Sequence, residues 1–202
     1  MNGNEDYLAL LDWRRHVADL YGEIRARLGR NPIDAHRYWC HRRDDLFRNH
    51  PQSALPADQR AAFHGLRYFE YNPRFAFTAK VRSLAEKRYD VDTSSGGPIT
   101  FVRFGAVDLP VGTLEVMWLD AYSGGVFLPF ADATAGKTTY GGGRYLLDTA
   151  KSADLGARGD ELVLDFNFAY HPSCAYDPKW ACPLAPPGNR LAVAIEAGER
   201  MS

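Results

Sequence analysis

The chain has 202 residues, of which 46% are apolar and 13% are aromatic. This length suits one globular domain with a hydrophobic core, and the composition excludes a disordered or fibrous chain. Lysine and arginine together number 24 and aspartate and glutamate 25. Such a balance gives no overall field that would attract nucleic acid or an anionic membrane, so we expect neither as a partner.

Targeting and cysteine features predict a cytoplasmic protein. The start of the chain has no basic leader before its apolar stretch, and no run of about 18 apolar residues would span a membrane. The three cysteines, Cys40, Cys174 and Cys182, are too few for a disulfide framework, and their odd number suits a reducing compartment.

The first 65 residues predict a helical arm followed by a loop. Residues 5–29 place leucine, valine and isoleucine at helical spacing, with an acidic start and an arginine-rich end. Residues 31–47 predict a second helix, with Asn31 or Asp34 as its N-cap. Residues 57–63, "ADQRAAF", predict one further helical turn after a proline-containing loop.

From about residue 66 the pattern changes to short strands separated by glycine, proline and aspartate. Residues 74–84 alternate apolar and polar side chains, and residues 99–120 predict two or three strands broken at Gly105 and Pro110. Further strands are predicted within residues 122–132, 161–170 and 190–198. We therefore predict an α+β protein in which a two-helix arm (1–65) precedes a mainly antiparallel β-sandwich or barrel (66–202), together one structural domain.

The string "AGKTT" at residues 135–139 resembles the end of a nucleotide-binding loop. Such a loop needs its first glycine at position 131, which is alanine, and a helix directly after the Gly-Lys-Thr step. Three glycines at 141–143 occupy the place where that helix would begin. We therefore expect these glycines to serve turns or a bulge in a β-hairpin rather than to hold a phosphate.

Several longer strings resemble a known family. They are "WCHRRDDLFRNHPQSALP", "FHGLRYFEYNP", "FADATAGKTTYGGGRYLLD", "LDFNFAYHPSCAY" and "CPLAPPGNRLAVAIEAGE". Over about residues 38–199 the chain resembles the short form of the uncharacterised prokaryotic family DUF1684 (domain of unknown function). His171 departs from the asparagine that the family typically has in its "AYNP" step. The family has no established activity, so the resemblance implies identity but no reaction.

Polar residues that suit a binding site gather in the family-like C-terminal part. Strand alternation in "LVLDFN" puts Asp165 and Asn167 on one face, which would line a cavity if it faces inward. The roles we predict there are Arg144 as the partner of an anion, Asp165 and Glu199 as catalytic acid–base groups, and, as further ligand-binding groups, Tyr140, Asn189, Asn167 and Asp132. The alternative is that these buried charges and amides only brace one another.

These features predict a small-molecule-binding β-domain, which is a binding protein or an enzyme acting on a polar or anionic metabolite, with its cofactor left undetermined. The alternative is a non-catalytic interaction or homo-oligomerisation protein in which the polar cluster is structural. A third reading, a flavin-binding barrel, rests on fold analogy alone.

No metal site is predicted. His171, Cys174 and Cys182 form an H-x2-C-x7-C pattern that lacks the fourth ligand of a structural zinc site. A disulfide between the two cysteines and a pair of buried free thiols both stay open. His36 and Cys40 lie one helical turn apart, and we expect the histidines of that helix to be exposed to solvent.

Overall fold

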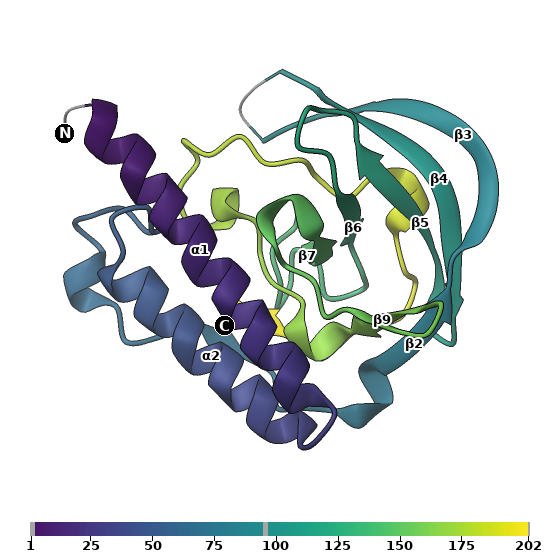
Figure 1. Cartoon of the computed structure of the whole chain (residues 1–202), viewed down its shortest axis with the longest axis horizontal. Coiled ribbons are helices and arrows are strands. Elements are labelled where there is room, and N and C mark those ends of the chain that lie inside the picture. The colour runs from purple at the N-terminus through teal and green to yellow at the C-terminus, as the bar shows by residue number, and fades with distance from the viewer. Residues whose placement is uncertain (1–2, 95–96, 202) are drawn as a thin grey trace.

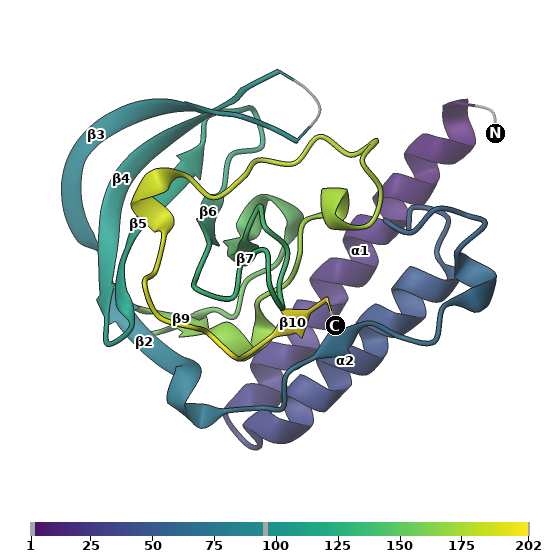
Figure 2. The ribbon, with the colours of Figure 1, turned by 180° about the vertical axis from the view of Figure 1, so that it is seen from behind.

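The computed structural model describes residues 3–94 and 97–201, and it shows two helices lying side by side along a body made of β-sheets (Figures 1 and 2). The helices are α1 (Gly3–Leu28) and α2 (Pro32–Asn49). The predicted two-helix arm and the α+β class are confirmed. Short 3-10 helices lie between the longer elements: η1 (Arg60–Ala62), η2 (Pro73–Phe75), η3 (Thr149–Lys151), η4 (Phe166–Phe168), η5 (Ser173–Ala175) and η6 (Pro187–Asn189).

The strands form three antiparallel sheets. One has five strands in the order β3 (Arg82–Val91), β4 (Ile99–Leu109), β5 (Gly112–Leu119), β6 (Val126–Phe130) and β7 (Arg144–Asp148). The second has the order β2 (Ala76–Lys80), β9 (Glu161–Asp165) and β8 (Ala157–Arg158), and the third pairs β1 (Arg67–Tyr68) with β10 (Glu199–Arg200). Within the described ranges these sheets do not close into a barrel by hydrogen bonding.

Local sequence explains where the helices begin and what they bury. Asn31 caps α2, because its side-chain oxygen accepts the Asp34 backbone N–H at 3.2 Å. Each helix buries one stripe of side chains, and these stripes pack with residues that follow β7 and with β9 and η4. The shared core contains Leu20, Tyr21, Ile24, Leu28, Ala35, Trp39, Ala153, Leu155, Val163 and Phe168. The helices therefore share a hydrophobic cluster with β9, η4 and the residues that follow η3.

Three strand predictions need correction. The single strand expected at 74–84 is two strands, β2 and β3, which belong to different sheets. Gly105 does not end a strand, because β4 continues through it with a shift in register against β5. Residues 190–198 do not form the expected strand, since apart from a bridge at Arg190 they lack ladder partners in the described chain.

The connection between β6 and β7 answers the question posed by "AGKTT". Residues 131–143 contain no helix, and they return the chain between two antiparallel neighbours. Gly143 has φ +92°, and a Cβ placed there would lie 2.4 Å from the Phe130 carbonyl oxygen. Glycine is required at that point because the hairpin ends approach each other closely. The expected hairpin is confirmed.

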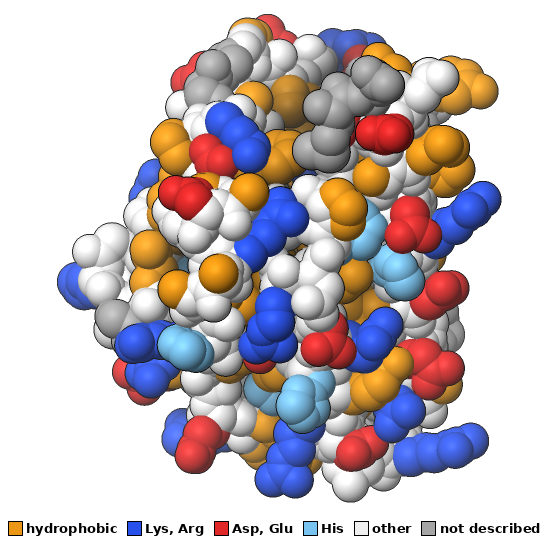
Figure 3. Space-filling model, turned by 90° about the vertical axis from the view of Figure 1, so that its left-hand side faces the viewer, with side chains coloured by type: hydrophobic (Ala, Val, Ile, Leu, Met, Phe, Trp, Pro, Cys, Tyr) orange, Lys and Arg blue, Asp and Glu red, His pale blue; other side chains and the backbone are white. Residues whose placement is uncertain are grey.

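The surface carries both signs of charge. On the face that Figure 3 shows, basic and acidic side chains are interspersed over the whole view. Among the described residues, no helix has the length and apolar character needed to cross a bilayer.

Candidate functional site

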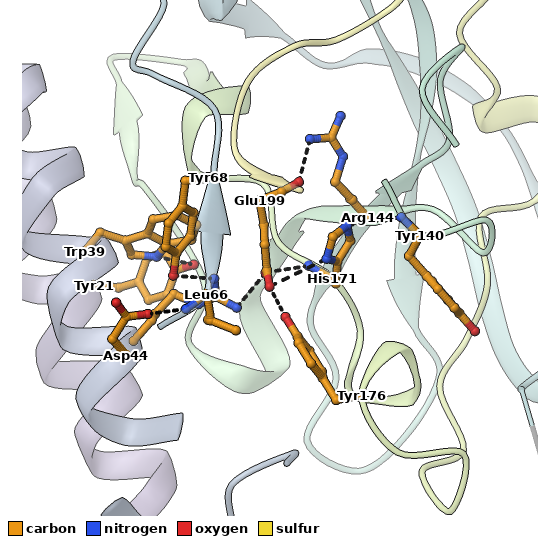
Figure 4. Close-up of polar contacts among 11 residues, drawn as sticks. Tyr21, Trp39, Asp44, Leu66, Tyr68, Tyr140, Arg144, His171, Tyr176 and Glu199 are labelled. Atoms are coloured by element: carbon orange, nitrogen blue, oxygen red, sulfur yellow. Dashed lines mark hydrogen bonds and ion pairs between the residues drawn. The ribbon is translucent and has the colours of Figure 1, made fainter. Parts of the chain in front are cut away.

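A buried carboxylate, Glu199, organises the centre of the candidate site. Its side chain is 1% exposed and it lies on β10, next to the C-terminus. It accepts a hydrogen bond from Arg43 at 2.9 Å, from the His171 backbone N–H at 3.0 Å, and from the Tyr176 hydroxyl (Figure 4). We call Glu199, Arg43, His171 and Tyr176 the Glu199 cluster, and it ties the last strand to α2.

The charges of this cluster are fixed by its geometry. Burial opposes ionisation of Glu199, but the charge of Arg43 and the hydrogen bonds from His171 outweigh it and lower the pKa of Glu199 to about 2. Burial likewise opposes the charge of Arg43, and the Glu199 carboxylate raises its pKa above the ordinary value. The guanidinium carbon also lies 4.7 Å from the ring centroid of Trp39 and 5.4 Å from that of Tyr170. Both groups therefore stay ionised near neutral pH.

Both ring nitrogens of His171 are engaged by the protein. Nε2 accepts the Tyr140 backbone N–H at 3.2 Å, so in the neutral ring the proton sits on Nδ1, which faces a Glu199 carboxylate oxygen at 3.5 Å. His171 is thereby held in one orientation. The ring positions the cluster rather than offering a free nitrogen as a base.

A glycine places Glu199 against the β-body. Gly198 has φ +76°, and a Cβ there would lie 2.5 Å from the Ala169 carbonyl oxygen and 2.6 Å from that of Phe166. Only glycine allows the chain to approach η4 this closely. The next residue, Glu199, donates its backbone N–H to the same Ala169 carbonyl at 2.9 Å.

Arg144 is fully buried but serves the backbone of the C-terminal segment. Its guanidinium donates to the carbonyl oxygens of Ile195 at 2.8 Å, of Glu199 at 3.2 Å and of Ala197. Burial lowers the pKa of Arg144 to about 10, and Asp132, 3.5 Å away, opposes that shift. The Glu199 side chain points away from the guanidinium, which reaches only its backbone oxygen (Figure 4).

These bonds also explain why the strand expected at 190–198 is missing. Arg144 supplies donors to its carbonyl groups, and the Asp132 carboxylate accepts the Ile195 N–H at 2.6 Å. From Ile195 onward, side chains thus take the place of a neighbouring strand, whereas Leu191 and Val193 bond to the backbone of residues 131–133. The alternation of apolar and polar residues in the sequence does not show that side chains will replace strand partners.

Asn189 likewise fixes backbone. It is completely buried, its side-chain oxygen accepts the Glu115 N–H at 2.9 Å, and its amide donates to the carbonyl oxygens of Glu115 and Pro129. It therefore joins η6 to β5 and β6. All these bonds are made to the protein itself.

Asp165 and Asn167 form a separate cluster. Their side chains meet at 2.7 Å, but not through the predicted strand alternation, because β9 ends at Asp165, which caps η4, and Asn167 lies in η4. Asn167 brackets the Asn72 backbone, and the Tyr71 hydroxyl donates to Asp165 at 3.3 Å. Burial raises the pKa of Asp165 to about 6, although hydrogen bonds from Asn167 and Tyr71 oppose the shift.

The seven predicted site residues therefore fall into several groups rather than around one hollow. Arg144 contacts Asp132 by side chain and Glu199 by backbone, while Asp165 and Asn167 face Tyr71. Tyr140 turns its hydroxyl toward the thiol of Cys174, 3.6 Å away, and away from the Glu199 carboxylate. Their roles in binding or catalysis stay predictions.

Arg43 and Tyr176 were not predicted. The sequence did contain a signal for Arg43, because it continues the buried stripe of α2 formed by Ala35, Trp39 and Phe47. An arginine at a core-facing helical position needs a buried partner. Tyr176 offered no comparable signal, since it follows η5 in irregular chain.

Two pockets flank the Glu199 cluster. The first, of about 100 Å³, lies between α1, α2 and residues 170–173, and is lined mostly by apolar and aromatic side chains such as Val17, Leu20, Tyr21, Phe47, Tyr145 and Tyr170. Three basic side chains, Arg43, Lys151 and His171, share that lining. The second, of about 220 Å³, reaches Glu199 and Tyr176 from the other side.

A cysteine–histidine pair on α2 lines a further open groove. His36 Nε2 and Cys40 Sγ are 3.6 Å apart. His36 is only 6% exposed, which corrects the expectation of solvent exposure. Burial lowers the pKa of His36 to about 4 and raises that of Cys40 to about 12, so the proton stays on sulfur. The pair therefore lacks the thiolate of a nucleophilic cysteine.

Three side chains of metal-ligand type, one aspartate and two histidines, also meet where α1 passes the end of α2. The ligand atoms of Asp12, His16 and His50 lie within 4.8 Å of one another. However, the Gln52 backbone N–H donates to His50 Nδ1 at 3.0 Å, which places the ring proton on Nε2, facing Asp12 at 3.3 Å. A metal would need that nitrogen deprotonated, so the arrangement suits a hydrogen bond better than a cation.

Comparisons with known proteins agree with this architecture. No curated protein matches the chain. A solved structure, the solution NMR structure of an uncharacterized protein from Haloarcula marismortui, is 33% identical over 80% of this chain and 90% of its own, with a TM-score of 0.56. The profile described as "Protein of unknown function (DUF1684)" matches residues 61–200. This range contains all the described strands and every member of the Glu199 cluster except Arg43, which lies on α2. The chain therefore belongs to the DUF1684 family.

Proposed function

We propose that this protein binds a small organic anion, a carboxylate with an apolar body, in the pocket between α1, α2 and residues 170–173. The observation that carries the proposal is the combination of an apolar, aromatic lining with the cationic side chains of Arg43 and Lys151 in one pocket. Ligand sites are typically apolar cavities with a few convergent polar groups. A charged lining of one sign selects the opposite charge in the ligand.

Hydrogen-bonding capacity supports an anion. Arg43 carries about five N–H groups, and its bonds within the described chain are one to Glu199 and one to the Tyr68 hydroxyl. Tyr21 accepts from Trp39 at 3.4 Å and keeps its own O–H for donation. Donors therefore outnumber acceptors on this wall, as a carboxylate requires.

The pocket volume limits the ligand. About 100 Å³ is less than the engineered cavity of about 150 Å³ that binds benzene in another protein. A short-chain acid matches this scale, whereas a benzene ring already exceeds it. The isoalloxazine system of a flavin is far larger, so the proposal does not include a flavin.

In this proposal Glu199 and Arg144 are positioning residues. Glu199 holds Arg43 and His171 at the pocket wall, and Arg144 holds the C-terminal segment that carries Glu199. Asp165 lies in its own cluster with Tyr71 and does not line the pocket. The proposal is one of binding and assigns no reaction.

The test is a thermal-shift and calorimetric series with propionate, butyrate and isobutyrate against their neutral amides. Stabilisation by a ligand follows its concentration relative to Kd. Binding of an acid but not its amide supports the proposal. Equal binding of acid and amide, or no binding by the whole series, overturns it.

Lys151→Gln provides the matched variant. Lys151 is 61% exposed and pairs with Asp148 at 3.3 Å, whereas Lys179 is 57% exposed and pairs with Asp177 at 2.9 Å, outside the pocket. We expect Lys151→Gln to weaken acid binding about two- to fivefold, the range of an exposed ion pair, and Lys179→Gln to leave it unchanged. An equal effect of both variants contradicts the assigned pocket.

The alternative of a homo-oligomer stays a prediction. Tyr7, Leu8 and Leu11 on α1 are 75%, 66% and 43% exposed, and they lie on one helical stripe. No described part of the chain covers them.

A further inference from the structure

A second chemically distinctive place lies beside η5, where Cys174 and Cys182 meet. Both cysteines are buried and unpaired, and the Cys174 backbone N–H donates to the Cys182 sulfur at 3.3 Å. The Cys174 sulfur also lies 3.6 Å from the Tyr140 hydroxyl. We propose that Cys174 and Cys182 form an oxidation site at which a peroxide converts the dithiol into an intramolecular disulfide.

The surrounding chain holds the two sulfurs together. The Ser94 hydroxyl accepts the Cys182 N–H at 3.1 Å and donates to the Trp180 carbonyl, while the Ser94 N–H donates to the Cys182 carbonyl at 3.0 Å. These bonds fix the loop between the cysteines against the end of β3. Because the Cys182 sulfur already contacts the Cys174 backbone, the two side chains start close together, as formation of a disulfide requires.

The surroundings of the pair favour a thiolate. The hydrogen bond from Cys182 lowers the pKa of Cys174 to about 6 against the opposing effect of burial, and the bond with Tyr140 acts in the same direction. The pKa of Cys182 is raised correspondingly. The proton that remains is shared by the pair, as in other coupled sites.

A small oxidant can approach the pair from the side of Cys182. Cys182 and Ser173, the residue before Cys174, line a pocket of about 260 Å³ together with Lys151 and Trp180. The Lys151 ammonium there is 61% exposed and favours negative charge on the pair. Cys40, in contrast, lies on α2 with its pKa raised to about 12 by burial.

The chemistry balances with hydrogen peroxide as the oxidant. The Cys174 thiolate attacks one peroxide oxygen, so that an S–O bond forms, the O–O bond breaks and the leaving hydroxide becomes water after taking a proton. Cys182 then attacks the sulfenic sulfur, forming the S–S bond and releasing a second water. Both sulfurs are oxidised and the two peroxide oxygens are reduced. A dithiol reductant reverses the reaction.

The experiment treats the full chain with hydrogen peroxide, alkylates the remaining thiols and measures intact and peptide masses. In wild type and in Cys40→Ser we expect a linked Cys174–Cys182 peptide that dithiothreitol removes. In wild type, Cys40 remains alkylatable, with the pair reacting at least about tenfold faster than Cys40 at neutral pH. Equal loss of all three thiols, or disulfides only between chains, overturns the proposal.

Two variants test the order of the steps. Cys182→Ser lacks the second thiol, so Cys174 should stop at the sulfenic acid, which dimedone traps. Cys174→Ser should react slowly and yield no intramolecular link. The rate in wild type should rise with pH through about 6, and a thermal unfolding transition confirms that each variant is folded. A dimedone adduct on Cys40 instead of Cys174 contradicts the assignment.

Discussion

At the scale of single residues, the candidate site depends on buried charges whose partners come from distant parts of the sequence. Glu199 and Arg43 are separated by most of the chain, yet their ion pair at 2.9 Å is almost completely buried. Removing one member of such a pair leaves the other as an uncompensated charge. The loss of stability therefore comes from the buried charge of the partner that remains.

We expect Glu199→Gln to lower the free energy of unfolding by about 3–5 kcal/mol, because Arg43 would stay buried without its counter-charge. Urea denaturation measures the change. Glu196→Gln serves as the control, since Glu196 is exposed three residues earlier. A loss of less than about 1 kcal/mol, the range of an exposed pair, would mean that the pair is not buried in solution.

At the scale of elements, an irregular segment, residues 190–198, occupies a place in the β-body where a strand was expected. Residues 190–198 cross the β-body without a ladder. Arg144 and Asp132 satisfy polar groups of Ile195 and Ala197, while Leu191 and Val193 bond to the backbone of residues 131–133. The segment then reaches Gly198, where the close approach to η4 delivers Glu199 to its cluster. Placement of the last strand thus depends on one arginine and one glycine.

A comparison of two glycines distinguishes the cost of backbone strain from the cost of a steric clash. Gly198 and Gly136 have φ +76° and +73°, but a Cβ at Gly198 would clash with two carbonyl oxygens, whereas a Cβ at Gly136 meets nothing within 4 Å. We expect Gly136→Ala to cost about 1 kcal/mol, the strain of the left-handed region. Gly198→Ala should cost at least about twice as much. Equal denaturation midpoints would contradict the close approach at Gly198.

At the scale of the whole molecule, helices and sheets share a core, and buried carboxylates in different clusters couple its stability to pH. Glu199 has a pKa lowered from 4.5 to about 2, so its contribution is present above the ordinary pKa and is lost as the pH falls toward 2. Asp165 has a pKa raised from 3.8 to about 6. Between pH 3.8 and about 6, the folded protein therefore binds more protons at Asp165 than the unfolded protein does.

For Asp165 the sign is opposite to that of Glu199. Its contribution is fully present below pH 3.8 and is lost as the pH rises through about 6. In wild type the free energy of unfolding should therefore fall by up to about 3 kcal/mol as the pH rises, and Asp165→Asn should remove this decrease. Urea midpoints between pH 4 and 7 measure it, with the exposed Asp160→Asn as control. The same pH slope in wild type and Asp165→Asn would contradict the raised pKa.

The sequence by itself determined the helices, the α+β class, the hairpin at "AGKTT" and the family, because periodicity, capping and ordered motifs are local properties. It also placed Asp165 beside Asn167, which are neighbours along the chain. Only the tertiary structure decided that Arg144 binds backbone, that residues 190–198 lack a ladder, and that Arg43 faces Glu199. Those outcomes depend on contacts between groups that are distant in the sequence and meet only in the folded core. The spacing of residues along the chain does not predict such contacts.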